Sequence, residues 1–314
     1  MSDTKKQLEQ RLGRIHARQR LGIEADYGHR VFGKGINFFH PENWYSAHSI
    51  IKFILQISGM YERGKRNARN IRIRNNNLSI EGLPGPFENY TILHLSDLHV
   101  DMYPAATDAL LESLATIKSD ICVMTGDYRA RTFGSIDQTM QGMKRVAEAI
   151  RTPIYAVLGN HDSVSMLPGL EASGIQVLMN ESVEIIRDGQ TIYLCGVDDA
   201  HYFRVENIAQ AMEDVPDNAV SILLSHTPEI YRQATHAGVT FMLCGHTHGG
   251  QICLPGGVPL TLDASCPRFM GNGAWRYGNM RGYTSVGCGT SIVNARFNCL
   301  PEITLHRLTA NLPG

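Results

Sequence analysis

The chain has 314 residues, enough to bury a full-sized hydrophobic core, and its 43% hydrophobic and 19% charged residues are typical of a globular protein. A formal net charge of −1 argues against a protein dedicated to nucleic-acid binding, which would be strongly basic. The charge is uneven, because residues 1–75 contain 15 Lys and Arg against 6 Asp and Glu, whereas the remainder is net acidic. We expect part of that acidity to belong to metal ligands.

Residues 1–69 are predicted to form a basic, helical N-terminal extension. Apolar residues between 3 and 22 are spaced as on a helix, residues 23–43 are expected to be irregular, and a second helix is expected from Trp44 to about Met60. The arginines that flank this second helix suit anionic lipid headgroups, so one hypothesis is a membrane-surface anchor. Packing on the catalytic domain or on a partner subunit is the alternative, and the sequence leaves both open.

The chain carries no predicted targeting or membrane-spanning segment. Its first residues are polar, and no apolar run approaches the roughly 20 residues that a membrane span needs. The seven cysteines are odd in number and form no CxxC pair, which indicates a reducing compartment and no zinc–thiolate site. We therefore expect a cytoplasmic protein, with peripheral contact at the inner membrane face as a further hypothesis and the oligomeric state open.

Residues 70–314 are predicted to form the catalytic domain. Asn75–Asn77 are expected to turn a hairpin at its start, and Asp188-Gly189 a second hairpin that makes the sheet mixed. From residue 90 onward strand-like and helix-like stretches alternate, which indicates an α/β (α+β) fold with helices on the faces of its sheets. The expected strands are Tyr90–Leu95, Ile121–Thr125, Ile154–Leu158, Ile192–Cys195, Val220–Leu224, Phe241–Cys244, Thr284–Val286 and Ile303–Leu305, and the expected helices fall near residues 105–118, 135–150, 205–213 and 228–236.

Side chains that can bind metals follow five of these strands. A single Asp or His in such a place is usually a turn, cap or packing residue. Five strand ends of this kind indicate one shared site, because functional groups in open α/β sheets gather beyond the carboxyl ends of the strands. The candidate ligands are Asp97, His99, Asp127, Asn160, His226, His246 and His248.

The number of candidate ligands favours two metal ions. One tetrahedral zinc takes three or four protein ligands, whereas seven ligands with one bridging carboxylate suit two ions about 3.5–4 Å apart. Mixed imidazole and carboxylate ligands favour manganese, iron or zinc over magnesium or calcium. Two such ions lower the pKa of a shared water toward about 7 and bind phosphoryl oxygens.

The motifs Asp-x-His, Gly-Asp, Gly-Asn-His-Asp, a lone His and Gly-His-x-His resemble the signature of the calcineurin-like metallophosphoesterase superfamily, from about residue 70 to 308. Gly82-Leu83-Pro84, Gly196-Val197-Asp198-Asp199 and Ser225-His226-Thr227-Pro228 more closely resemble bacterial phosphodiesterases related to UDP-diacylglucosamine pyrophosphatases. The resemblance implies two mixed β-sheets packed as a sandwich and flanked by helices.

The same resemblance implies a role for each ligand. One metal would be held by Asp97, His99, Asp127 and His248, and the other by Asp127, Asn160, His226 and His246, so that Asp127 bridges the two. His161 would act as the general acid or stabilise the leaving group, oriented by Asp162.

The implied function is a two-metal phosphohydrolase, above all a phosphodiesterase, in which a metal-bridging hydroxide attacks phosphorus in line. Its substrate would be a phosphodiester or pyrophosphate, either a small molecule or a lipid. One alternative is a metal-dependent nuclease, which the acidic charge of the catalytic part disfavours. Others are a nucleotide-lipid pyrophosphatase at the membrane surface and a non-catalytic metal-binding scaffold, which the presence of every ligand and of His161 disfavours.

The chain departs from two branches of the superfamily. Three residues after Asp127 stands Ala130, where purple acid phosphatases carry a tyrosine and Ser/Thr protein phosphatases an arginine. Arg129 and Arg131 are candidate phosphate-binding residues, with a solvated loop as the alternative. Asp198-Asp199 are expected to form a turn after a strand, and His94 is expected to pack within its strand. His201 and Tyr202 would either line a substrate groove or lie in a surface loop. Arg296 would either point at the edge of the site or form a structural salt bridge.

Overall fold

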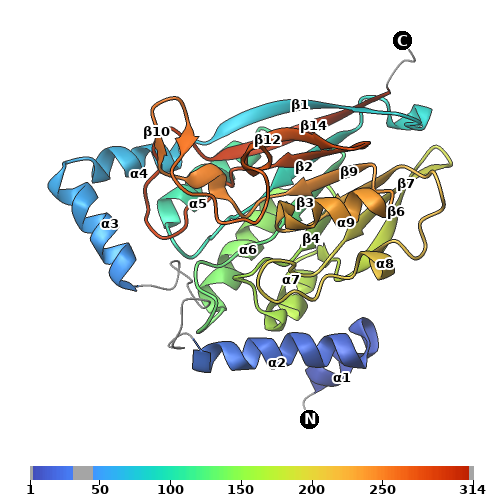
Figure 1. Cartoon of the computed structure of the whole chain (residues 1–314), viewed down its shortest axis with the longest axis horizontal. Helices are drawn as coiled ribbons and strands as arrows, with labels where there is room; N and C mark the ends of the chain where they lie inside the picture. The colour runs from blue at the N-terminus through green and yellow to red at the C-terminus, as the bar shows by residue number, and fades with distance from the viewer. Residues whose placement is uncertain (1–2, 31–44, 311–314) are drawn as a thin grey trace.

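The computed structural model describes residues 3–30 and 45–310, and within this part of the chain two six-stranded sheets pack face to face with helices on their outer sides (Figure 1). The α/β (α+β) sandwich of two mixed sheets is therefore confirmed. Residues 23–30, expected to be irregular, instead continue a helix, since the stretch contains no proline to stop it. The rest of that expected irregular segment lies outside the described residues.

The first sheet has the strand order β1, β14, β2, β3, β4, β5. Strands β2 to β5 are parallel, which brings their carboxyl ends to one edge, while β14 runs antiparallel to β2. The bounds are β1 (Arg72–Ile80), β14 (Glu302–Ala310), β2 (Thr91–Leu95), β3 (Ile121–Thr125), β4 (Ile154–Val157) and β5 (Ile175–Val177).

The hairpin expected at Asn75–Asn77 is wrong. These residues continue β1, which pairs in parallel with β14 along its whole length. Asn76 lies opposite His306, and its side-chain Nδ2 lies 3.0 Å from Nδ1 of that histidine, 230 residues further along the chain. This distant partner satisfies the polar side chain, so the local turn that asparagine favours does not form.

The second sheet has the order β12, β13, β9, β8, β7, β6. The hairpin predicted at Asp188-Gly189 is confirmed, because both residues have positive φ and join β6 to β7 in antiparallel pairing. The bounds are β12 (Gly273–Tyr277), β13 (Met280–Thr284), β9 (Phe241–Cys244), β8 (Ser221–Leu224), β7 (Gln190–Gly196) and β6 (Glu181–Arg187), and a short hairpin joins β10 (Cys253–Leu254) to β11 (Val258–Pro259).

Three buried clusters show how the layers stack. Ile92 and Val123 of the first sheet pack against Leu194, Ile222 and Leu243 of the second. The outer face of the first sheet packs on α5 (Pro104–Leu114), α6 (Asp137–Ala149) and α7 (Leu167–Ala172), and that of the second on α8 (Ile208–Ala211) and α9 (Tyr231–His236). Short 3₁₀ turns lie at Gly85–Phe87, Val164–Met166, Pro228–Ile230, His248–Gly250 and Arg268–Gly271.

In the described residues of the N-terminal extension, four helices lie against the catalytic part of the chain. They are α1 (Asp3–Leu12), α2 (Arg14–Arg30), α3 (Tyr45–Ile57) and α4 (Tyr61–Arg69), which Figure 1 draws below and to the left of the sheets. Leu8, Leu12 and Ala17 join the core under the first sheet. Leu55 of α3 packs on Phe297, while Ile57 stays exposed. None of the helices in the described ranges has the length and apolarity to cross a membrane.

Candidate metal centre

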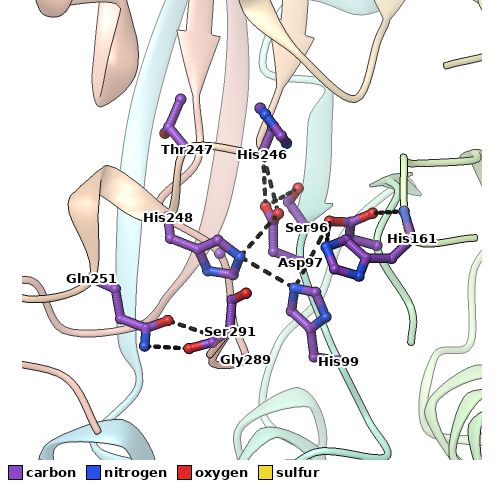
Figure 2. A network of polar contacts seen from close by, with 12 residues as sticks. Ser96, Asp97, His99, His161, His246, Thr247, His248, Gln251, Gly289 and Ser291 are labelled. Atoms are coloured by element: carbon purple, nitrogen blue, oxygen red, sulfur yellow. Dashed lines mark hydrogen bonds and ion pairs between the residues drawn. The ribbon is translucent and has the colours of Figure 1, made fainter. Parts of the chain in front are cut away.

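The candidate ligands lie on loops that follow strands of both sheets. The first sheet supplies Asp97 and His99 after β2, Asp127 after β3, and Asn160 with His161 after β4, while the second supplies His226 after β8 and His246 with His248 after β9. All of these side chains are buried. Figure 2 shows His248 and the backbone of His246 next to the carboxylate of Asp97, and His99 and His161 next to a second carboxylate.

Five of these residues hold a backbone conformation that side chains rarely adopt. Their φ angles are 50° at Asp97, 40° at His99, 58° at Asp127, 72° at His246 and 50° at His248. A left-handed conformation at a residue other than glycine costs on the order of 1 kcal/mol or more, and such strain concentrates at functional sites. The strained loop conformations therefore lower the stability of the fold, and they point these side chains at one another.

Two glycines let the loops approach closely. A Cβ at Gly245 would overlap Ser96 Oγ and Asp97 Oδ2, and one at Gly159 would overlap Asp127 Oδ1. The backbone N–H of His246 then donates to Asp97 Oδ2 at 3.0 Å, which ties the two sheets together at the site. The glycine before each motif is thus required by close approach.

Asp97, His99 and His248 form the first potential metal-binding group. His99 Nε2 lies 3.2 Å from His248 Nε2, and His248 Nε2 lies 3.5 Å from Asp97 Oδ1. Ligand atoms about 2.0–2.1 Å from one ion lie about 3 to 3.5 Å from each other, so these separations fit a shared cation. His99 Nδ1 donates to the carbonyl of Arg129 at 2.7 Å, which leaves Nε2 as the nitrogen that faces the site.

Asp127, His226 and His246 form the second group, joined by Asn160. His226 Nε2 lies 3.3 Å from Asp127 Oδ2, 2.9 Å from Asn160 Oδ1 and 3.1 Å from His246 Nδ1. His226 Nδ1 donates to the carbonyl of Thr125 at 2.7 Å, again leaving Nε2 toward the site. These separations fit a second cation.

Asp127 Oδ2 lies between the two groups, 3.9 Å from His99 Nε2 and 3.3 Å from His226 Nε2. The donor set and the separations fit a pair of divalent cations with Asp127 shared. The preference of these ligands for manganese, iron or zinc stays a prediction.

Burial and neighbouring charges shift the pKa values of the ligands in different directions. Burial lowers the pKa of His246 and of His248 well below the usual range, so both are neutral, as ligands must be. Burial alone would lower the pKa of His226, but the adjacent Asp127 carboxylate raises it to about 10. Burial alone would raise the pKa of Asp127, and His226 followed by His161 holds it well below its ordinary value.

Asp162 stabilises the loop that carries His161. Its Oδ2 accepts hydrogen bonds from the backbone N–H groups of Asp127 at 2.8 Å and Gly159 at 2.9 Å, and its Oδ1 from that of Tyr128 at 2.9 Å. The backbone N–H of His161 donates to Asp127 Oδ1 at 2.9 Å. Burial and the nearby Asp127 charge raise the pKa of Asp162 to about 7.

A chain of hydrogen bonds leads from the edge of the first sheet to Asp97, and sequence reasoning missed it. It runs from Asn76 to His306, then to His94, Thr125, Ser96 and finally Asp97 Oδ2. His94 is fully buried in it, as the packing interpretation expected. The sequence feature that could have indicated this chain is that Ser96 and Thr125, which carry hydroxyl groups, directly adjoin ligand motifs.

An apolar groove of about 470 Å³ opens beside the centre. Asp127, His161 and His246 of the metal centre are among the residues that line it. Its walls come from α3 and from loops after β9 and β13, with Ile51, Ile54, Leu55, Ile252, Leu260, Ile292 and Val293. Packing on the catalytic domain was one alternative for this helix, but no local sequence pattern specifies its contact with the site.

Arg129 and Arg131, predicted as phosphate-binding residues, are not among the residues that line this groove. The side chain of Arg129 is buried and donates to the carbonyl of Gly134 at 3.3 Å, whereas Arg131 is exposed. Their contact with a substrate stays a prediction.

Arg296 is fully buried and backs His248. Its Nη2 donates to the carbonyls of Gly289 at 2.7 Å and Val286 at 2.8 Å and lies 3.3 Å from His248 Nδ1. It therefore holds the loops together through backbone carbonyls.

Asp198 and Asp199 come directly before a turn at residues 200–203. Asp199 Oδ2 accepts hydrogen bonds from the N–H groups of Tyr202 and Phe203, both at 2.7 Å. This turn places His201 with its ring centroid 4.1 Å from that of His246 and its Nδ1 3.1 Å from Glu229 Oε2. His201 therefore lies at the border of the metal centre.

Comparison with known proteins agrees with this geometry. A family model described as calcineurin-like phosphoesterase matches residues 90–250, a range that includes every candidate ligand. The chain belongs to the calcineurin-like phosphoesterase family. The resemblance of the motifs to the calcineurin-like superfamily is thus confirmed, and the chain is a metal-dependent phosphoester hydrolase.

Two bacterial relatives and one solved structure are similar to this chain. An uncharacterized metallophosphoesterase of Bacillus subtilis, YkoQ, is 29% identical over 259 residues, which are 78% of this chain and 93% of that protein. The phosphodiesterase YaeI of Escherichia coli is 28% identical over 237 residues, which are 70% of this chain and 82% of that protein. The solved structure of the NAD nucleotidase NadN from Haemophilus influenzae is similar with a TM-score of 0.42 and 17% identity, covering 64% of this chain and 45% of that one.

Proposed function

We propose that the chain is a phosphodiesterase that works with two divalent cations. The observation that carries this proposal is the pair of ligand groups that share Asp127, one with Asp97, His99 and His248 and the other with His226 and His246. When bound, two such cations activate a water and stabilise charge on phosphoryl oxygens. The similarity to a phosphodiesterase supports the choice of diesters over monoesters.

His161 is the proposed proton donor to the leaving group. Its Nε2 lies 3.9 Å from Asp127 Oδ2, and the residue lines the groove in which a substrate would lie. An imidazole beside a carboxylate is suited to carrying a proton near neutral pH. The loop contacts of Asp162 keep this imidazole at the edge of the centre.

The test is hydrolysis of bis(p-nitrophenyl) phosphate by purified protein, first treated with EDTA and then given manganese, zinc or cobalt. We expect activity that depends on metal, with two ions per chain by elemental analysis. His248→Ala should lose one ion and lower the rate by about 10²-fold or more. His236→Ala, which removes an exposed histidine of α9, is the matched control and should behave as wild type. Full activity of His248→Ala would overturn the proposal.

A finer proposal concerns the substrate, which we infer to be a phosphodiester or pyrophosphate with an apolar chain. The supporting observation is the apolar lining of the groove, to which Ile54 and Leu55 of α3 contribute together with Leu260 and Val293. This substrate class agrees with the resemblance to nucleotide-lipid pyrophosphatases. The nuclease alternative has no comparable support.

Two nitrophenyl diesters that differ in chain length test the substrate class. Dodecyl p-nitrophenyl phosphate should have a lower KM than methyl p-nitrophenyl phosphate. Ile54→Gln should raise the KM of the dodecyl ester by about tenfold, because a polar wall removes part of the hydrophobic contact, and leave the methyl ester unchanged. Ile186→Gln, at an exposed isoleucine of β6, is the control. Equal KM values for the two esters would contradict the proposal.

Peripheral contact with a membrane would suit such a substrate. Ile50, Phe53 and Ile57 of α3 are exposed. In a flotation assay with anionic vesicles, wild-type protein should rise with the vesicles and the double variant Phe53→Ser/Ile57→Ser should not. Equal flotation of both proteins would refute the contact.

A further inference from the structure

Arg20, from the N-terminal helix α2, is fully buried beside the loop that carries Asn160 and His161. Its Nη2 donates to the carbonyl of Asp162 at 2.8 Å, and its Nε lies 3.4 Å from Asp198. The guanidinium carbon lies 3.3 Å from the ring centroid of Phe203. One side chain of the extension thus contacts two loops at the edge of the metal centre.

Glu24, one turn further along α2, extends this contact. It accepts hydrogen bonds from Arg20 Nη1 at 3.0 Å and from the backbone N–H of Val164 at 3.1 Å, and Ser163 Oγ donates to its other oxygen. Three successive residues of the loop, Asp162 to Val164, are therefore bonded to α2. We call Arg20 and Glu24 the α2 clamp.

The charges in the clamp are compensated. Burial alone would raise the pKa of Asp198, but Arg20 and then His16 hold it below its ordinary value, so the carboxylate is ionised. His16 Nε2 lies 3.0 Å from Asp198 Oδ2, and Asn180 Nδ2 lies 3.0 Å from His16 Nδ1. A buried arginine persists only where it is paired in this way, and removing one partner is costly.

The loop held by the clamp is the one that sets the position of His161. The carbonyl of Asp162 accepts a hydrogen bond from Arg20, and its carboxylate accepts from the N–H groups of Asp127 and Gly159. His161 lies directly before it and donates its own N–H to Asp127 Oδ1. A shift of this backbone would therefore move the imidazole relative to Asp127, and misplacement by about 1 Å can cost about 10²-fold in rate.

We propose that Arg20 and Glu24 are positioning residues for His161, so that the N-terminal helix α2 is part of the catalytic machinery. This inference rests on the proposed function, in which His161 gives a proton to the leaving group. Neither residue is among those that line the groove, so each acts through the loop.

The experiment compares two full-length variants on two diesters. Methyl p-nitrophenyl phosphate releases a leaving group that needs no proton, whereas methyl phenyl phosphate releases one that does. His161→Ala defines the full effect of losing the donor. Arg20→Met should lower kcat on the phenyl ester by about tenfold or more, and on the nitrophenyl ester by less than about threefold. Metal content should stay at two ions per chain.

Arg20→Lys keeps the charge and should recover part of the loss on the phenyl ester. Arg18→Met, at an exposed arginine of the same helix, is the matched control and should keep the wild-type ratio of the two rates. Should Arg20→Met fail to fold by circular dichroism, Glu24→Leu, whose side chain is partly exposed, gives the same ratio measurement.

The outcomes separate this inference from the function on which it rests. If wild-type protein hydrolyses neither ester with any metal, the proposed function is wrong. If wild-type protein is active and the folded clamp variants lower both rates equally, Arg20 and Glu24 are structural and the inference is wrong. A selective loss on the phenyl ester supports both.

Discussion

A single carboxylate, Asp97, is held by a hydrogen-bond chain with a fixed direction. Asn76 Nδ2 can only donate and the Asp97 carboxylate only accepts, so each group between them must donate toward the metal centre. His306 then donates to His94 Nδ1, and His94 donates through Nε2 to Thr125 at 2.9 Å. The chain therefore fixes both tautomers and the orientation of the ligand.

Removing one hydroxyl from this chain should weaken metal binding. Thr125→Val keeps the shape of the side chain but leaves His94 and Ser96 without their partner, so the Asp97 carboxylate loses its fixed orientation. We expect Mn²⁺ affinity to fall by about 10- to 100-fold, measured by titration calorimetry on EDTA-treated protein. Thr125→Ser retains the hydroxyl and should bind as wild type. Equal affinity of the valine variant would show that the chain does not support the ligand.

The ligands lie on loops that directly follow strands, and many of these strand ends and ligands could be predicted from the sequence. Runs such as Ile121–Thr125 and Phe241–Cys244 are short, apolar and followed at once by Gly and a ligand, so strand ends and site residues could be predicted together. The left-handed backbone conformation of Asp97 and His248 could not be predicted, because these residues lie where loops of the two sheets meet.

Gly245 offers a test at this scale. In Gly245→Ala the new Cβ would overlap Ser96 Oγ and Asp97 Oδ2, so the loop carrying His246 must move away from the first sheet. We expect the variant to lose metal-dependent activity and about 1–3 kcal/mol of unfolding free energy in urea. Gly85→Ala, where a Cβ meets open space and φ is ordinary, is the control and should change neither. Unchanged metal content in Gly245→Ala would refute the close-approach argument.

The elements that sequence reasoning missed share one cause, which is pairing over long chain distances. Asn75–Asn77 favour a turn locally, yet β14 pairs with them as a continuous strand. Arg20 looks like any surface arginine of a basic helix, yet Asp198, 178 residues away, pairs with it in the interior. No pattern within a window of the sequence encodes such partners.

At the scale of the whole molecule, the metal centre joins the two sheets. Asp97 and Asp127 come from the first sheet, and His226, His246 and His248 from the second. Bound cations would therefore stabilise the folded sandwich as well as support the chemistry, because the unfolded chain offers no preformed site.

The histidine pair His94 and His306 lies between the sheets, where His306 packs on Tyr283 and Phe241 of the second sheet. Burial lowers the pKa of His94 to about 3 and that of His306 well below the usual value, with His94 adding to the effect on the latter. Both are therefore neutral in the folded protein, while an unfolded histidine takes up a proton near pH 6.5.

This difference in pKa makes the fold sensitive to acid. A depressed folded pKa leaves stability intact above about pH 6.5 and removes it as pH falls from there toward 3, because only the unfolded chain binds the proton. Between pH 6.5 and 5 we expect His94 alone to cost about 2 kcal/mol of unfolding free energy. His94→Gln can accept from His306 and donate to Thr125 but does not titrate, so urea unfolding in EDTA should show a smaller loss by about that amount. If wild type and variant lose stability in parallel over this range, the neutral buried pair is not the source of the acid sensitivity.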